Sequence, residues 1–488
     1  MEQLKKATLQ DLETITSYYK NVNFHLSPYT KFWKQLWFEY ADINWAIVHN
    51  CLVIRQCWSD EPHKDAYWEI PISLSGNEKD EIEAIKWIFD YCHQHEIKPE
   101  FRHIPAHKMN LIASAFMGIC EYNVERDYSE YIYDAAEFKN AIGSKFARVR
   151  NFIKLFKKNY ANYSFSELNK DNLNEAVEFA KQWWINHNTV SNHFWANESA
   201  NAEVNFIKNF DFKKYVGLIL KVDNQVVGLS LGEIQNDILY VVIEKSLHSI
   251  RGVDAFLSNE FAKHYTNENI KYISRCDDEG IPGLRKSKLQ YHPTEIVKTI
   301  TVFPHTYLKS LVNKIPTIKT LNKGLILKDI SPNDTNYLWL CIDEVNNQYY
   351  DYNWKPDFYA NHRQDEKPDI HWFLNQRKEW LKNEWEMSWG IYNEHNVLVG
   401  EVCLHNFSFR NDCEVGVRIL PQFHHQGYAY EAVKEAICFC YYELGVDLVK
   451  IKAYKENTNS INLIKKLNAS KVNQDDKFIY FEILPSNL

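Results

Sequence analysis

Long apolar segments are absent from this chain. No run approaches the ~18 consecutive apolar residues that a membrane-spanning helix needs. The first residues, 1–6, also lack the apolar core of a secretory signal. We therefore expect a protein that has no transmembrane segment and stays in the cytoplasm.

Cysteine pairs with metal-binding or redox spacing are absent as well. The ten cysteines include no C-x-x-C pair, so neither a zinc site nor a disulfide framework is indicated. Cys438 and Cys440 are two residues apart on an expected helix and point to different faces. We expect buried thiols and assign no metal. No repeat of roughly 20 to 50 residues is visible, which excludes a solenoid.

The overall composition is that of an ordinary globular protein. Of the 488 residues, 45% are hydrophobic and 25% are charged. A chain of this length is expected to form about three folding units. The formal net charge of -8 argues against a surface that binds nucleic acid over its whole area. Aromatic residues make up 15% of the chain, enough to line grooves as well as to fill cores.

Helix-like and strand-like patterns alternate along the chain, which predicts a layered α/β architecture. The expected elements are helices at 12–19, 79–95, 173–186 and 252–265, and strands at 45–53, 128–133, 215–222, 226–233 and 237–244. Residues 306–322 contain Pro316 and several lysines but no strong period. We interpret this segment as a linker with one helical turn, which divides the chain into residues 1–305 and 323–488.

The most informative segment begins with an apolar strand at 415–420, which Pro421 ends. A short polar loop with one glycine, Gly427, then opens into a helix that begins near Tyr428. The first N–H groups of a helix have no intrahelical partner, and the positive end of its dipole faces the loop. The pattern therefore predicts an anion site in which the backbone holds a pyrophosphate.

Two motifs in this region resemble those of the GNAT N-acetyltransferase family, and the likeness extends over roughly residues 323–488. Residues 424–429, HHQGYA, resemble the R/Q-x-x-G-x-G/A loop that holds the pyrophosphate of coenzyme A. Residues 457–467 resemble the N-x-x-S-x-x-L-x-x-K-L run that closes the cofactor site. Residues 325–334 and 389–404 resemble the first strand and central hairpin of the ribosomal-protein N-acetyltransferase branch.

The resemblance implies an acetyl-CoA-dependent N-acetyltransferase whose acceptor is a primary amine. The cofactor-binding residues that it implies are Arg418, Ile419, Leu420, His424, His425, Gln426, Gly427, Tyr428, Ala429, Asn457, Asn459 and Ser460. Glu414 matches the carboxylate that acts as general base in many relatives, with an exposed strand-end carboxylate as the alternative. Ile464 stands where many relatives carry the tyrosine that returns the proton, so that role is unassigned.

Two further runs lie in residues 1–305. DYSEYIY at 127–133, followed by GSKF, and RCDDEGIPGLRKSK at 275–288 resemble signatures of the phosphatidylglycerol lysyltransferase C-terminal domain family. The resemblance implies two acyltransferase-like lobes, about 1–125 and 126–305, and hence three GNAT folds in the whole chain. Characterised members of that family move an amino acid from aminoacyl-tRNA to a lipid headgroup.

A basic segment supplies one candidate ligand surface in this half. Residues 139–158 hold seven Lys or Arg and no Asp or Glu. The expected helix at 145–158 presents Arg150 and Lys154 opposite its apolar arc. Such a face attracts phosphates, as in an aminoacyl-tRNA or an anionic headgroup. A solvated helix face is the alternative.

The second run supplies further candidates. Arg285 and Lys288 are three residues apart and can face one anion together. Asp278 can orient or deprotonate an incoming amine. Glu244 and Lys245, at the end of a strand, resemble the E-K pair of the family, with a salt-bridging turn as the alternative.

The sequence thus predicts an α/β protein in which an aminoacyltransferase-like module precedes an N-acetyltransferase that uses acetyl-CoA and an amine-bearing acceptor. One alternative makes the N-terminal half a non-catalytic binding module for tRNA, an anionic headgroup or a small amine ligand. Another is detoxification of an amine-bearing small molecule.

Overall fold

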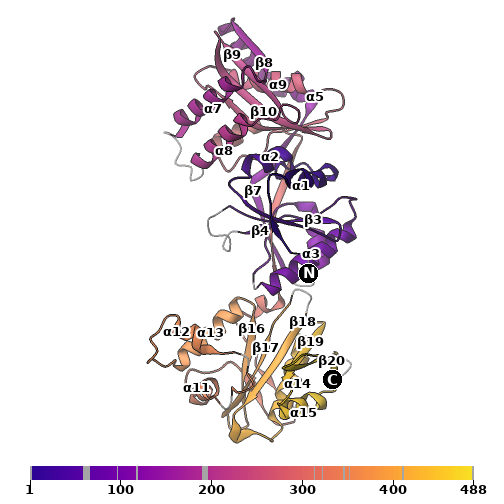
Figure 1. Ribbon diagram of the computed structural model, residues 1–488, viewed down its shortest axis with the longest axis vertical. Coiled ribbons are helices and arrows are strands. Elements are labelled where there is room, and N and C mark those ends of the chain that lie inside the picture. The colour runs from indigo at the N-terminus through magenta and orange to yellow at the C-terminus, as the bar shows by residue number, and fades with distance from the viewer. Residues whose placement is uncertain are drawn as a thin grey trace. The chain divides into compact units, whose positions relative to one another are not determined.

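The computed structural model describes residues 3–58, 66–95, 97–116, 119–188, 196–312, 314–320, 322–344, 347–350, 352–408 and 412–485. These residues form a mixed α/β fold with two β-sheets, which confirms the predicted layered architecture. The chain divides into two compact units (Figure 1). The first consists of Met1–Trp87, Pro99–Ile112 and Tyr122–Phe303, and the second of Ile88–Lys98, Ala113–Glu121 and Pro304–Leu488.

The first sheet has 13 strands in the described residues. Their spatial order is β1 (Lys5–Lys6), β2 (Asp42–Val48), β3 (Cys51–Cys57), β4 (Tyr67–Trp68), β6 (Phe101–Pro105), β13 (Glu295–His305), β7 (Ile119–Asp134), β12 (Tyr272–Ser274), β11 (Ile238–Ser246), β10 (Gln225–Gln235), β9 (Val216–Val222) and β8 (Tyr163–Glu167), with β5 (Ile72–Ser73) beside β3. The strands predicted at 215–222, 226–233 and 237–244 are confirmed as β9, β10 and β11.

Helices cover both faces of this sheet around β8 to β11 (Figure 1). The helices of residues 12–289 are α1 (Leu12–Tyr18), α2 (Lys31–Trp37), α3 (Glu78–Gln94), α4 (Met109–Ala115), α5 (Ala135–Asn140), α6 (Ala147–Asn159), α7 (Leu173–Asn188), α8 (Ala196–Lys208), α9 (Val253–Tyr265) and α10 (Pro282–Leu289). Successive residues of a strand point to opposite faces. Leu218 and Leu220 accordingly pack with α5, α6 and α9, whereas Ile219 between them packs with α2, α7 and α8.

The single strand predicted at 45–53 is wrong, because the structure divides it into a hairpin. β2 ends at Val48 and β3 begins at Cys51, and these two residues pair across the turn. The two turn residues, His49 and Asn50, have φ angles of 47° and 61°. A two-residue hairpin turn of this kind requires positive φ at both positions and usually contains glycine. No glycine marks this turn, so the sequence gives little warning of it.

The second sheet has eight strands in the described residues. Their order is β14 (Ile318–Lys319), β15 (Ile326–Lys328), β16 (Glu386–Tyr392), β17 (Leu398–His405), β18 (Asp412–Ile419), β19 (Leu448–Tyr454), β21 (Phe478–Ile483) and β20 (Ser470–Gln474). The helices of this part are α11 (Thr335–Ile342), α12 (Trp354–Tyr359), α13 (Ile370–Lys382), α14 (Tyr428–Tyr442) and α15 (Thr458–Lys466).

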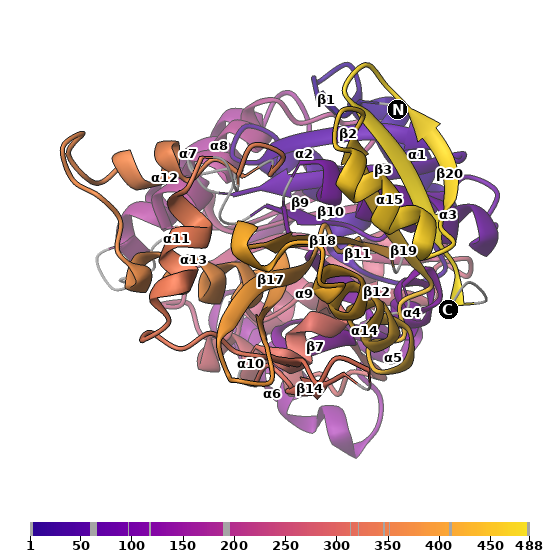
Figure 2. The same cartoon turned by 90° about the horizontal axis from the view of Figure 1, so that it is seen from below.

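The two faces of this sheet pack against different helices. Val415 and Trp389 point to the face that α14 covers. Tyr392 and Leu398 contact the cluster formed by α11 and α13. Figure 2 shows α11 and α13 (orange) and α14 and α15 (yellow) on opposite sides of β17 and β18. The side chains that line the α11/α13 face therefore come from alternate positions of β16, β17 and β18.

The segment 306–322, predicted as a linker with one helical turn, contains a 3-10 turn at Tyr307–Leu311 and the strand β14. β14 pairs with β15 in antiparallel fashion, so its backbone is part of the second sheet. In the part of the chain that the structure describes, no helix combines the length and the hydropathy that crossing a bilayer requires.

Candidate functional site

β18 and β19 separate along their length. Their parallel pairing joins Asp412 with Leu448 through Glu414 with Lys450, and within residues 412–485 no further pair follows. On its other edge β18 remains paired with β17 as far as Ile419. The backbone of residues 415–419 therefore has one edge that no strand covers, and an extended ligand could hydrogen-bond along it.

The loop after β18 forms an anion cradle. His425 has a φ of 59° and Gly427 one of 81°, so two left-handed residues turn the backbone just before α14. Among the described residues, no acceptor is found for the backbone N–H groups of Gln426, Gly427, Tyr428 and Ala429. Clustered N–H groups at a helix N-terminus attract phosphate. The structure thus brings together the loop residues that the sequence predicts.

A lysine that the sequence analysis missed reaches the same loop. A side chain on Gly427 would place its Cβ 3.6 Å from Lys323 Cε. The backbone N–H of the preceding Asn322 donates to Glu431 Oε1 at 2.9 Å, and Glu431 lies in the first turn of α14. This contact fastens the chain before β15 to α14 and leaves the exposed Lys323 beside the cradle. Its position near a glycine loop about a hundred residues away has no local signal in the sequence.

The predicted residues around the cradle have specific local roles. The ring Nε2 of His424 lies 2.8 Å from the Ile419 carbonyl oxygen, so the imidazole reaches back to the end of β18. Asn457 caps α15, because its Oδ1 accepts from the Ser460 backbone N–H at 3.1 Å. Asn459 lies in the first turn of the same helix, which packs against α14. Ile464, in the place of a tyrosine, is fully buried.

Glu414 lies where the pairing of β18 with β19 ends. Its Oε2 accepts a hydrogen bond from Asn406 Nδ2 at 2.8 Å, and its Oε1 is 3.6 Å from Lys452 Nζ on β19. The side chain is 16% exposed. It is therefore oriented from both sides while keeping contact with solvent, as a carboxylate that accepts a proton requires.

Arg418, which the resemblance implies as a cofactor-binding residue, has side-chain partners within the protein. It forms an ion pair with Glu401 on β17, with Nη2 at 2.7 Å from Oε2. Arg377 of α13 approaches the other oxygen of Glu401 at 3.4 Å, and Tyr337 donates to it at 3.1 Å. Burial alone would raise the pKa of Glu401, but the two guanidinium groups lower it. This network lies on the face of the sheet that packs against α11 and α13.

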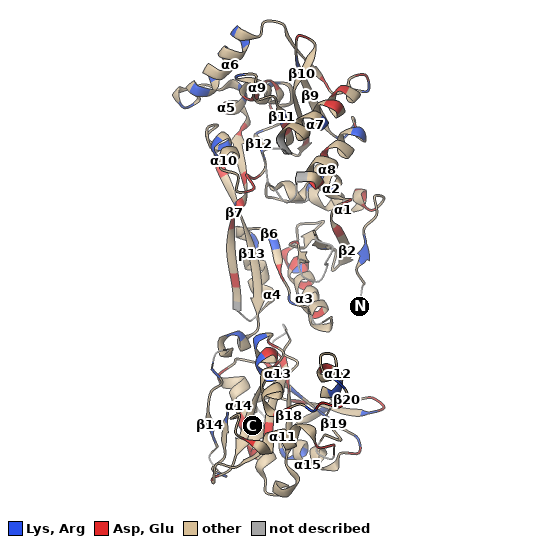
Figure 3. Cartoon of the chain, turned by 90° about the vertical axis from the view of Figure 1, so that its left-hand side faces the viewer, with Lys and Arg blue, Asp and Glu red and all other residues tan. Residues whose placement is uncertain are grey.

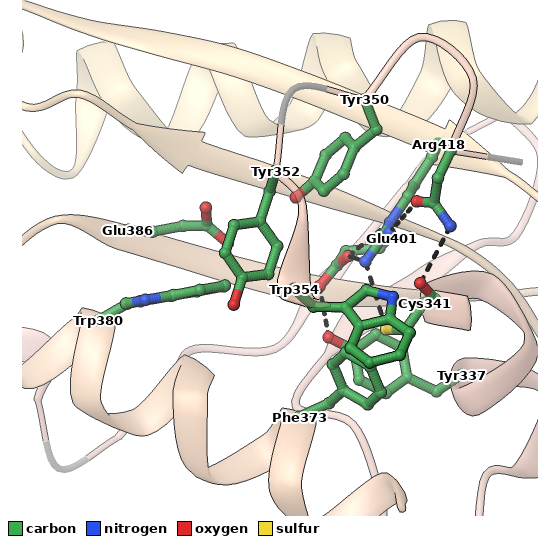
Figure 4. Close-up of a pocket in the computed structure, with 11 residues that line it drawn as sticks. Tyr337, Cys341, Tyr350, Tyr352, Trp354, Phe373, Trp380, Glu386, Glu401 and Arg418 are labelled. Carbon is green, nitrogen blue, oxygen red and sulfur yellow. Dashed lines mark hydrogen bonds and ion pairs between the residues drawn. The ribbon is translucent and has the colours of Figure 1, made fainter. Parts of the chain in front are cut away.

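A second carboxylate on this face has no such partner. Glu386 begins β16, and among the described residues no Lys, Arg or His pairs with it. Burial and the nearby negative charge of Glu401 raise its pKa to about 7. Figure 4 shows Glu386 beside Tyr352 and Trp380 at one end of a pocket. This residue is not among the site residues that the sequence predicts.

Ionisation of Glu386 should reduce stability, and the effect can be measured. A carboxyl whose pKa is raised by folding does not change the free energy of unfolding below about pH 4.5, where it is protonated in both the folded and the unfolded state. It lowers the free energy of unfolding by its full amount above about pH 7. Glu386→Gln removes the charge. The free energy of unfolding of the variant should therefore exceed that of the wild type by about 1–2 kcal/mol at pH 8 and equal it at pH 4. Hydrogen exchange of the β16 amides measures this difference. A difference that does not change with pH would contradict it.

In the first unit, Asp278 is enclosed by cationic and hydroxyl donors. Arg285 donates to both its oxygens, at 2.9 and 2.6 Å, and Arg126 approaches at 3.1 Å. Tyr131 also donates to Asp278, which has no exposed side-chain surface. Burial would raise the pKa of Asp278, but the hydrogen bonds from Arg285 and Tyr131 lower it to about 2. It is therefore a structural anion here rather than a base for an amine.

The sequence predicts that Arg285 and Lys288 face one anion together, and the structure contradicts this prediction. The second partner of Arg285 is Asp127 at 2.5 Å. The Lys288 ammonium donates to the backbone carbonyls of Arg275 and Asp277, and its residue is only 5% exposed. Burial raises the pKa of the neighbouring Asp277 to about 8. Arg285 and Lys288 are thus each held by separate partners within the protein.

Glu244 and Lys245 point to opposite faces of β11. Glu244 pairs with Arg275 at 2.6 Å and accepts from the Ser258 hydroxyl at 2.7 Å. Lys245 pairs with Glu203 at 3.1 Å and lies over the rings of Trp183 and Trp184, at 4.2 and 4.4 Å from their centroids. The two residues therefore belong to separate clusters.

The predicted basic helix is α6 with the 3-10 turn before it. Lys154 and Lys158 are exposed, and in the described residues no carboxylate pairs with either. Arg150 is half-buried and donates to the carbonyls of Ala141 and Gly143, both at 2.6 Å, so it holds the preceding turn in place. Figure 3 shows Lys and Arg along α6 without Asp or Glu. No group of three His, Cys, Asp or Glu in the described residues could hold a metal ion.

Family comparisons cover most of the chain. The family model described as "Phosphatidylglycerol lysyltransferase, C-terminal" matches residues 35–303. The model described as "Acetyltransferase (GNAT) domain" matches residues 325–470. These are the two families that the sequence motifs resemble, so that prediction is confirmed. A search of curated proteins found no match.

Solved structures match different shares of the chain. A conserved protein of unknown function from Bacteroides thetaiotaomicron is 24% identical with a TM-score of 0.57, over 62% of this chain and 100% of that one. L-PGS from Bacillus licheniformis is 14% identical with a TM-score of 0.44, over 62% and 94%. An acetyltransferase of the GNAT family from Bacillus anthracis is 18% identical with a TM-score of 0.29, over 35% and 98%. The first of these shows a shared fold.

Proposed function

Because the chain belongs to the phosphatidylglycerol lysyltransferase C-terminal family through residues 35–303 and carries a GNAT acetyltransferase domain at residues 325–470, we propose that it transfers an acetyl group from acetyl-CoA to a primary amine. The observation that carries this proposal is the cradle before α14 beside the open edge of β18. Domain boundaries at 1–305, 306–322 and 323–488, with three GNAT-like folds in all, are part of the proposal.

The residues of the cradle fit acetyl-CoA. The N–H groups of Gln426, Gly427, Tyr428 and Ala429 would hold its pyrophosphate, and the free backbone edge that leads to Ile419 and Leu420 would hold its extended arm. When bound, acetyl-CoA supplies an activated acetyl thioester. Helix α15, whose first turn contains Asn459 and Ser460, would close the far side, and Asn457 caps the start of that helix.

Glu414 is proposed to accept the proton that the acceptor ammonium must lose. An amine is mostly protonated at neutral pH and attacks only as the free base. Asn406 and Lys452 orient the Glu414 carboxylate, so a proton on the amine would move to one of its two oxygens.

Lys323 is expected to add to the hold on the pyrophosphate. An exposed cation near phosphate contributes a few tenths of a kcal/mol to about 1 kcal/mol, so Lys323→Ala should weaken CoA binding about two- to fivefold. Calorimetric titration of CoA into the full chain measures this. Lys328→Ala is the control, because Lys328 on β15 instead contacts Asn396 and the Tyr392 ring. Equal affinity for wild type and the Lys323 variant would place this lysine away from the phosphates.

The N-terminal module supports a second proposal, which is recognition of a phosphate-bearing partner such as aminoacyl-tRNA. The observation that favours it is the pair of exposed lysines on α6, Lys154 and Lys158, that lack carboxylate partners in the described residues. Replacing both lysines with Glu should abolish the retention of RNA by the protein in a filter-binding assay, together with the salt dependence of that retention. Unchanged retention would leave α6 as a solvated face.

A further inference from the structure

A narrow pocket on the α11/α13 face is lined mainly by aromatic rings. The rings come from α11, α12, α13 and the chain just before α12, and are those of Tyr337, Tyr350, Tyr352, Trp354, Phe373 and Trp380. Tyr352 and Trp380 meet edge to face, with centroids 4.8 Å apart and an interplanar angle of 89°. The floor consists of Glu386, Glu401 and Arg418 (Figure 4).

The charged residues at the base of the pocket differ in how many partners each has. Glu401 is satisfied by Arg418, Arg377 and Tyr337, and Arg418 in turn lies 4.3 Å from the centroid of the Tyr350 ring. Glu386 forms no ion pair in the described residues: the Ser388 hydroxyl is beside it, and Arg377 and Arg418 act on it only as nearby charges. A carboxylate that lacks a direct ion-pair partner and lies beside two aromatic rings favours a positively charged guest.

The size of the pocket restricts that guest. Its cavity volume is about 10 Å³, which is room for a single water-sized group. A primary ammonium is of this size and donates three hydrogen bonds, whereas a planar guanidinium is larger. The pocket therefore suits the end of a slender aliphatic amine.

The register of the sheet sets the distance from Glu386 to the proposed reaction centre. Glu386 pairs with His405 on β17, and His405 pairs with Glu414 on β18, so all three point to one face. Two strand spacings separate Glu386 from Glu414, which is about 10 Å. A nitrogen bound at Glu386 is therefore not the nitrogen that Glu414 would deprotonate.

We propose that this pocket binds a second, non-reacting ammonium of the acceptor, and that the acceptor is an aliphatic chain with two amines about 10 Å apart. The inference rests on the proposed N-acetyltransferase activity, and it names the class of its substrate. Glu386 serves as the counter-ion, and Tyr352 and Trp380 flank the ammonium.

The test compares matched acceptors with the full chain and acetyl-CoA. One series consists of linear diamines of increasing length, and the other of amino alcohols of equal length, in which a hydroxyl replaces the second ammonium. The diamine whose nitrogens are about 10 Å apart should have the highest kcat/KM and exceed its amino alcohol at least about tenfold, chiefly through KM. Glu386→Gln should reduce the diamine to the level of the amino alcohol.

Glu379→Gln provides the control, since Glu379 is a 59% exposed carboxylate on α13 outside the pocket. It should preserve the preference for diamines. Equal rates with diamine and amino alcohol in the wild type, or a preference that survives Glu386→Gln, would overturn the inference and leave the acetyltransferase proposal intact. If no amine is acetylated, the proposed function fails. Calorimetry then still tests the pocket, which must bind the diamine more tightly in the wild type than in Glu386→Gln.

Discussion

Replacing Glu414 with glutamine should lower kcat for acetyl transfer by about 10² to 10⁴, because the acceptor ammonium then lacks its proton acceptor. Glutamine keeps the shape of the side chain and the contact with Asn406. The affinity for CoA should stay within about twofold, since Glu414 acts on the amine and not on the pyrophosphate. Steady-state rates with a saturating amine, together with a CoA titration, separate the two effects.

Glu443→Gln is the matched control for this experiment. Glu443 follows the last turn of α14, is exposed, and lies outside the proposed site, so its removal should change neither rate nor affinity. A Glu414 variant that keeps at least half of the wild-type turnover would make this carboxylate structural. Another group would then have to accept the proton.

Asp278→Asn should destabilise the first unit by about 2–3 kcal/mol at pH 7. Removing one partner of a buried ion pair costs about 3–5 kcal/mol, and the lower figure applies because Arg126 and Arg285 remain 40% and 32% exposed and can be hydrated. The native-state pKa of Asp278 is depressed to about 2 from 3.8. Its contribution is therefore present above about pH 4 and lost as pH falls towards 2.

Native-state hydrogen exchange of β7 and β12 amides measures this loss, because both strands flank the cluster. Asp127→Asn serves as the comparison. Asp127 also pairs with Arg285 but is 55% exposed, so its removal should change stability by less than about 1 kcal/mol. Equal effects of the two substitutions would mean that the burial of Asp278 is not what makes it stabilising.

The cradle could be read from the sequence because its determinants are contiguous. The apolar run at 415–420, Pro421, Gly427 and the helix from Tyr428 follow one another within about fifteen residues. The structure has β18 ending at Ile419 and α14 beginning at Tyr428, with Gly427 at a φ of 81°. Local chain chemistry decides such a turn, since few residues other than glycine adopt positive φ freely.

The pocket could not be read in the same way. Glu386 and Arg418 come from different strands, and only the register of β16, β17 and β18 brings them to one face. A glutamate at the start of a strand is also typical of an exposed residue at the end of a strand, so its sequence position does not indicate a buried site. One signal was available, namely the number of aromatic residues between Tyr337 and Trp389, although filling a core explains such residues equally well.

Arg285 and Lys288 show that contacts with residues distant in the sequence, and not the spacing along the helix, decide where a side chain points. Three residues apart on α10, they are neighbours on the helix surface. In the structure Asp127 on β7 and the buried Asp278 hold Arg285, while backbone carbonyls hold Lys288. Each satisfies a buried or partly buried polar group, and that requirement outweighs local adjacency. The residues of this signature therefore shape the loop rather than form an open anion site.

N-acetyltransferase activity can be tested by mass spectrometry of a library of primary amines after incubation with the full chain and acetyl-CoA. At least one amine should gain a single acetyl group, and no product should form when the chain or acetyl-CoA is omitted. If every amine is recovered unmodified while CoA binds at the cradle, the domain is a cofactor-binding module and not an N-acetyltransferase.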